Sequence, residues 1–376
     1  MYLRTLFFWG LFTLYSTSAF AQLGEDLSLY GYFQGQYKVE SFNFGGQKGT
    51  NSSFSLQQIN LLLKKNFGER FSSFVDLESV NTYSTERGWG GMKFSEAWFS
   101  YNPNRKLNVK LGLQVPVFNN LNDIKNRTPL LPYLFRPVVY ESSFNNFLQI
   151  NTFVPDQAYV NVEGTLASNR LKFDYAVYAG NESEFVPPDS LSSIPASTDT
   201  TESKLFGGRI GIRRGSLKAG FSGTIDHANM QQLGMGAVRR YRMGADLSFA
   251  VNSFFVESEF ISVTHNLSVT QEATLSFLSS QSLFLGSNLD KFYYYLLLGY
   301  RIGEQVTVYT SYDHLEDHAL GLAEEGVNIF SVGAAYWPIY SAVLKIQFID
   351  YRLKETSFAS FQFSGQSLYA GISVFF

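Results

Sequence analysis

The chain has 376 residues, with 29 Lys and Arg, 32 Asp and Glu, and no cysteine. A formal net charge of −3 is not the basic balance of a nucleic-acid-binding protein, so no nucleic-acid partner is expected. The lack of cysteine excludes a disulfide framework, a thiolate metal site, a cysteine nucleophile and an acyl-anchored lipoprotein.

The first residues have the pattern of a signal peptide. Arg4 provides a positive start, residues 5–15 form a short apolar run, and residues 19–21 have a small-x-small cleavage pattern. A transmembrane anchor is the alternative, but the run is shorter than the ~20 residues that span a hydrocarbon core. We therefore expect residues 1–21 to be a signal peptide and residues 22–376 to be one mature domain.

Aromatic residues dominate the composition. The chain contains 36 Phe, 23 Tyr and 4 Trp, and these make up 17% of its residues. The mean hydropathy is nevertheless −0.06. A membrane barrel explains both values, because it needs aromatic and aliphatic side chains on its lipid face and polar side chains in its lumen.

After residue 21 no segment shows the period of an amphipathic helix, but many segments alternate apolar and polar residues with period two. In residues 105–115, for example, every odd position from Leu107 to Val115 is apolar. The pattern predicts sixteen strands, an even number as bacterial barrels require. They are expected at about 27–39, 54–65, 70–80, 93–102, 105–115, 156–166, 170–180, 203–213, 216–226, 239–249, 253–264, 291–302, 305–313, 327–337, 342–352 and 366–376.

The connections between these strands alternate between short and long. The short ones, such as 66–69, 102–105 and 302–304, have the residues of tight turns. Short periplasmic turns and long external loops are typical of outer-membrane barrels, whereas a soluble β-sandwich has no reason to keep that order. We therefore predict an all-β fold, a transmembrane antiparallel β-barrel. The long loops are expected at about 40–53, 81–92, 116–155, 181–202, 227–238, 265–290, 314–326 and 353–365.

In architecture the whole mature chain resembles the 16-stranded outer-membrane porins of Gram-negative bacteria, and more loosely the phosphate-selective and related specific porins. The segments that carry the resemblance are 93–115, the Val-Pro-Val-Phe run at 115–118, the long loop after the fifth strand, and the terminal Val-Phe-Phe at 374–376. The leader that ends at Ala21 before Gln22 is compatible with a Bacteroidetes-like source. The resemblance implies passive diffusion of small hydrophilic solutes or ions, contact with outer-membrane lipid and lipopolysaccharide, and no cofactor. It leaves a homotrimer open.

Charged residues of the predicted lumen face form two groups. A basic and an acidic wall of this kind would set a transverse field across a pore, with no fixed preference for anions or cations yet evident. The alternative is that Asp174, Asp226 and Asp246 simply neutralise the bases as salt bridges. The basic group is Lys106, Lys110, Lys172, Arg209, Arg213, Lys218, Arg240 and Arg242, and the acidic group is Asp76, Glu78, Glu96, Glu257 and Glu259.

The third long loop, 116–155, is too apolar to be a solvated loop and contains five prolines. In the general porins, by resemblance, the loop at this place folds into the barrel and forms the constriction. We expect this loop to bring Lys125, Arg127 or Arg136 toward the basic wall. The alternative is that its apolar part covers a subunit interface or the barrel mouth.

Other functions fit the sequence less well. The four histidines fall at external strand ends or loops, no G-x-S-x-G nucleophile elbow occurs, and an enzyme is not expected. His314 and His318 could in principle bind a metal, but without a helix they do not share a face. A non-channel structural or secretion-accessory barrel is the main alternative. Four apolar residues lie on the unexpected face of their strands and are read as marks of β-bulges: Leu62, Phe330, Val332 and Ile349.

Overall fold

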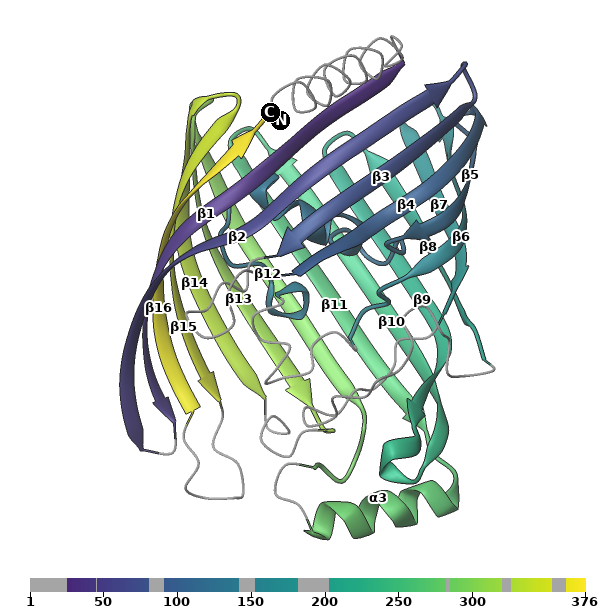
Figure 1. Ribbon diagram of the computed structural model, residues 1–376, viewed down its shortest axis with the longest axis vertical. Helices are drawn as coiled ribbons and strands as arrows, with labels where there is room; N and C mark the ends of the chain where they lie inside the picture. Colours follow the sequence, from purple (N-terminus) through teal and green to yellow (C-terminus); the bar gives the residue numbers. More distant parts are fainter. Residues whose placement is uncertain are drawn as a thin grey trace, which may run out of the picture.

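A computed structural model describes residues 26–44, 46–80, 91–141, 153–181, 203–281, 285–319, 326–353 and 363–376. The predicted signal peptide, 1–21, lies outside these residues. The described residues form sixteen antiparallel strands in one closed barrel, in which β1 pairs with both β2 and β16 (Figure 1). This closure confirms the predicted fold. It also leaves no open sheet edge, which would expose unpaired backbone groups to lipid.

The strands follow one another around the barrel in chain order. Their bounds are β1 Leu27–Phe44, β2 Gln47–Phe67, β3 Phe71–Val80, β4 Gly91–Asn104, β5 Leu107–Gln114, β6 Ala158–Ser168, β7 Leu171–Gly180, β8 Leu205–Arg214, β9 Leu217–Met230, β10 Gly236–Val251, β11 Phe254–Asn266, β12 Lys291–Ile302, β13 Val306–Asp317, β14 Val327–Ile339, β15 Ala342–Leu353 and β16 Phe363–Phe375.

Two of the predicted external loops are much shorter than expected. The loop predicted at 40–53 is mostly strand, because β1 and β2 continue to a tight turn that contains Gly46 with a φ of +85°. The loop predicted at 227–238 is reduced to residues 231–235 between β9 and β10. The first segment, 40–53, is largely polar, so its sequence gives little sign of a strand. In the second, Ala228, Met230, Met235 and Val238 are buried together in a hydrophobic cluster.

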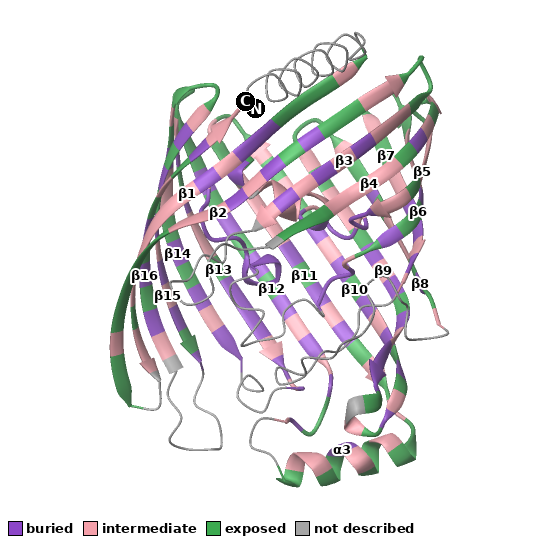
Figure 2. Cartoon of the chain, in the orientation of Figure 1, coloured by how far each residue is buried: buried purple, intermediate pink, exposed green. Residues whose placement is uncertain are grey.

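Buried and exposed residues alternate along the strands (Figure 2), and many of the exposed ones are large apolar side chains. Phe221 on β9 is 52% exposed on the outer surface, whereas its neighbour Ser222 is fully buried inside. Leu111, Phe173 and Leu247 are exposed in the same way on their own strands. The exposed apolar side chains thus form the lipid-facing surface that the period-two pattern predicted.

The prediction of bulges at Leu62, Phe330, Val332 and Ile349 is wrong. Strand pairing runs through all four positions without a shift of register. Phe330 and Val332 face outward, while Leu62 and Ile349 point inward and are 3% and 1% exposed. The two inward residues are apolar because they pack in hydrophobic clusters inside the barrel rather than facing water.

One helix was not predicted. Helix α3, Val269–Gln281, lies in the connection between β11 and β12, at the end of the barrel away from the start of β1 and the end of β16 (Figure 1). Only Leu275 is buried among its residues, so the helix has no apolar stripe to reveal it. No helix in the described ranges is long and apolar enough to span a membrane.

Candidate functional site

The described part of the segment between β5 and β6 is bound by inward-facing side chains of the barrel. It includes two short 3-10 helices, η1 (Asn122–Leu130) and η2 (Val138–Tyr140). On β11 the Glu259 carboxylate accepts hydrogen bonds from the backbone N–H groups of Asn120 at 2.9 Å and Leu121 at 2.8 Å. It also accepts one from the Tyr140 hydroxyl at 2.6 Å. Glu259 therefore binds both ends of the segment.

Further along the barrel, two other strands bind the same segment. The Gln347 side chain on β15 accepts hydrogen bonds from the backbone N–H groups of Leu134 and Phe135, each at 2.8 Å. Asp313 on β13 accepts one from the Val138 N–H at 3.1 Å. These contacts satisfy backbone groups that a buried loop would otherwise leave without partners.

Apolar side chains of the segment pack against aromatic and aliphatic side chains that point inward from β11 to β16. Tyr133 meets Tyr309, for example, with ring centroids 6.4 Å apart, and Phe135 meets Tyr369 at 6.3 Å. This half of the interior is a hydrophobic core. Its main members from the segment are Phe118, Leu121, Tyr133, Leu134, Phe135, Val138, Val139, Tyr140, Phe153 and Val154.

The opposite wall, from β5 to β10, is polar, and five of the eight predicted bases on it are paired with acids. Lys110 lies 2.7 Å from Glu163, and Arg209 lies 2.6 Å from Asp246. Lys106, Lys172 and Lys218, by contrast, are exposed and form no ion pair within the described residues. The predicted basic group is thus neutralised in part. The other pairs on this wall are Arg213 with Asp174, Arg240 with Asp226 at 2.6 Å, and Arg242 with Asp226 at 2.9 Å.

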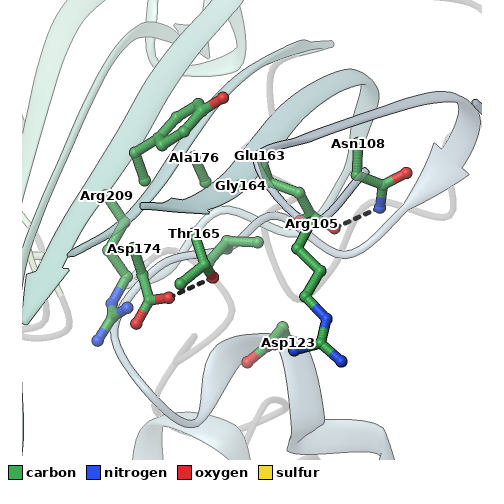
Figure 3. Close-up of a pocket in the computed structure, with 11 residues that line it drawn as sticks. Arg105, Asn108, Asp123, Glu163, Gly164, Thr165, Asp174, Ala176 and Arg209 are labelled. Carbon is green, nitrogen blue, oxygen red and sulfur yellow. Dashed lines mark hydrogen bonds between the residues drawn. The ribbon is translucent and has the colours of Figure 1, made fainter. Parts of the chain in front are cut away.

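A cavity of about 270 Å³ lies between this polar wall and the segment (Figure 3). Within it, Asn108 donates a hydrogen bond to Glu163 at 2.8 Å, and Thr165 donates one to Asp174 at 2.7 Å. Asp123 of η1 completes the lining from the side of the segment. Burial raises the pKa of Asp123 to about 6, and the positive charge of the nearby arginines and lysine acts against this rise.

The three bases of the segment are not gathered against the basic wall. Lys125 pairs with Asp156 at 2.9 Å, and Arg136 lies 3.6 Å from Glu141 of the same segment. Arg127 lies 3.8 Å from Glu96 on β4, at the acidic wall. In place of the expected cluster of like charges, each of the three bases lies within 4 Å of an acid.

The predicted acidic group is divided between two parts of the interior. On β3, Asp76 accepts a hydrogen bond from Asn60 at 2.7 Å, and Glu78 accepts one from Ser95 at 2.7 Å. Glu257, on β11, accepts one from the Tyr295 hydroxyl at 3.2 Å. Glu259, also on β11, binds the segment. Of the predicted acidic group, Asp76, Glu78 and Glu96 on β3 and β4 therefore remain as one wall.

Sequence reasoning missed the residues that hold the segment, in particular Asp313, Lys345 and Gln347. Lys345 on β15 donates hydrogen bonds to the carbonyl of Pro129 at 3.1 Å and to Gln34 at 2.9 Å. Their positions on the inward face were a usable signal, since Lys345 and Gln347 alternate with the outward Leu344 and Ile346.

The histidines considered as metal ligands have other partners. The His314 ring lies 2.8 Å from the Asn328 side-chain oxygen and 2.9 Å from Glu316. In the described part of the chain no group of three or more histidine or acidic side chains could hold a metal ion.

Comparison with known proteins shows the fold. The barrel is similar to OmpF of Salmonella typhi solved with daunomycin, with a TM-score of 0.62 and 12% identity over 93% of this chain and 97% of that one. It is also similar to the anion-selective porin from Comamonas acidovorans (TM-score 0.59, 12% identity, 93% and 100% covered). The outer-membrane channel DcaP of Acinetobacter baumannii gives a TM-score of 0.57 at 13% identity, with 94% and 98% covered. The fold is that of an outer-membrane porin.

No family model and no curated protein matches the sequence. The porin fold and the apolar outer face together identify the chain as an outer-membrane barrel, because a closed antiparallel barrel is the β-architecture that spans this membrane. The phosphate-selective branch and the Bacteroidetes-like source remain predictions. The paired charges of the polar wall do not favour a phosphate-selective ladder of bases.

Proposed function

We propose that the protein is a porin that lets small hydrophilic solutes or ions diffuse passively across the outer membrane, with the segment between β5 and β6 as its constriction. The hydrogen bonds that the inward-facing Glu259, Asp313 and Gln347 accept from this segment support the proposal most directly. A loop held in this way would narrow the pore permanently rather than gate it.

In this proposal water and solutes pass along the polar wall. At the level of the segment, the core formed with β11 to β16 fills one half of the interior, while the cavity lined by Arg105, Asp123 and Arg209 lies on the other side of the segment. Because acids and bases alternate along this wall, the field in the passage is strong locally but nearly balanced over its length. Selectivity between anions and cations should therefore be weak.

Planar-bilayer recording of the purified protein tests the proposal. Replacing residues 122–140 by a short glycine linker should increase the single-channel conductance. The matched control removes 268–281, which includes helix α3 and lies at the barrel end, and should leave the conductance unchanged. If both deletions leave it unchanged, the constriction lies elsewhere. A folded barrel that passes no current would instead indicate a structural or secretion-accessory role.

The assembly and surroundings of the porin are part of the same proposal. We expect contact with outer-membrane lipid and lipopolysaccharide around the apolar face, and a homotrimer, with no catalytic activity. The trimer is suggested by a similar barrel, OmpT of Vibrio cholerae, which was solved in a trimer form (TM-score 0.52, 9% identity). Light scattering in mild detergent should give three times the protomer mass. A mass equal to that of one protomer would refute the proposed trimer.

A further inference from the structure

A second and larger cavity lies inside the barrel, near the short turns. Its volume is about 860 Å³, and it is bounded by the β12–β13 turn, the β14–β15 turn and the end of η1. The start of β1 and the end of β16 lie at the same end of the barrel (Figure 1). Short turns are periplasmic in this architecture, so the cavity forms the periplasmic side of the lumen, below the segment that crosses it.

One side of this cavity is apolar although it faces the lumen. Leu130 is 48% exposed, and Leu131 and Pro132 beside it are half-buried. Trp337 and Phe255 face the same space. Removing apolar surface from water is favourable by ~25 cal/mol for each Å² that is buried, and these side chains do not gain that stabilisation while they face water. An occupant with an apolar group would recover it.

Arg301 and the acids Glu257 and Glu304 line the same cavity, and none of them forms an ion pair within the described residues. The Arg301 guanidinium carbon lies 5.4 Å above the Phe255 ring, and the described residues include no carboxylate paired with it. Glu257 accepts a hydrogen bond from Tyr295 and is only half-buried. Both groups therefore keep hydrogen-bonding capacity toward the cavity.

The Phe255 ring beneath Arg301 occupies space that a glycine leaves open. The ring lies against Gly299 on β12, where an added Cβ would come within 2.0 Å of it. The Arg301 side chain is thus held over a rigid surface rather than free in the lumen, which reduces the entropy that it loses on binding a ligand.

We propose that this cavity binds small amphipathic zwitterions, such as α-amino acids with an aromatic or branched apolar side chain. The carboxylate would accept hydrogen bonds from Arg301, the ammonium would donate to Glu257, and the apolar group would cover the surface of Leu130, Leu131 and Trp337. The cavity volume lies within the ~300–1,000 Å³ of small-molecule sites. The inference rests on the proposed porin function, since solutes would reach the cavity by passing the segment.

Tryptophan fluorescence of the detergent-folded protein tests the binding directly. L-Phenylalanine should shift the emission of Trp337 at a concentration at least tenfold below that needed with glycine, 3-phenylpropionate or 2-phenylethylamine. Each of these lacks one of the three recognised groups. Replacing Trp337 by phenylalanine should abolish the signal. If any of the three compounds binds as tightly as L-phenylalanine, the proposal of a zwitterion site is wrong.

Charge variants complete the test. R301Q and E257Q should each weaken L-phenylalanine binding about fivefold or more, as expected for the loss of a charge-assisted hydrogen bond. The control R70Q, in an exposed turn outside the cavity, should have no effect. Unchanged affinity in both cavity variants would overturn the inference. Fluorescence does not require conduction, so the two proposals can fail separately. A folded barrel that binds L-phenylalanine but passes no current would refute only the porin function. A barrel that conducts but does not bind L-phenylalanine would refute only this site.

Discussion

At the scale of single residues, Glu259 contributes most to the position of the segment. Its carboxylate has three donors, two backbone N–H groups and the Tyr140 hydroxyl, all within 2.9 Å. The variant E259A leaves these buried donors unpaired, and a free-energy loss of ~3 kcal/mol or more is expected. Denaturant unfolding in detergent measures it. E69Q in an exposed turn is the control, and equal midpoints for the two variants would contradict this role.

Two adjacent residues of β10 test which solvent each face meets. Leu247 is 42% exposed on the outer surface, while Ser248 lines the larger cavity. L247R should lower stability by ~2 kcal/mol, because a guanidinium would enter lipid. S248R should be tolerated, since its side chain can extend into the cavity. Refolding yields into lipid vesicles compare the two variants, and equal yields would show that the faces are assigned wrongly.

At the scale of elements, α3 begins at a reciprocal side-chain cap and packs against the β9–β10 connection through Leu275. The Ser268 and Gln271 side chains each bond the other's backbone N–H, at 3.3 Å and 2.9 Å. This capping box was the one signal in the sequence for the helix. The variant S268A should cost the helix ~1 kcal/mol and speed amide exchange within 269–281, while the barrel's melting temperature stays the same. A fall in the melting temperature would mean that α3 supports the barrel.

The strands were predictable from sequence because each one alternates by itself, and the short turns fix their pairing. Arg240 and Asp226 lie directly opposite in register, so even this ion pair follows from the β9–β10 connection. The inward apolar residues could not be interpreted in the same way. Ile349 faces inward because a segment more than two hundred residues earlier packs against it, and such a contact leaves no periodic trace in the sequence.

At the scale of the whole molecule, the field in the pore depends on which charges are paired rather than on how many there are. Arg209 and Asp246 form a bidentate pair beside the smaller cavity, at 2.6 Å and 3.0 Å, and come from strands separated by β9. Neither charge alone dominates the passage while the pair is intact. Removing one member exposes the other to passing ions with little screening, because a narrow lumen holds little salt.

The reversal potential in a salt gradient should therefore respond in opposite directions to the two halves of this pair. D246N leaves Arg209 without its partner and should shift the potential toward anion selectivity. R209Q leaves Asp246 and should shift it toward cations. The double variant removes both charges together and should return close to the wild-type value, which separates a change of field from a general distortion of the barrel. If neither single variant moves the potential, ions do not pass along this wall, and the proposed route for solutes is wrong.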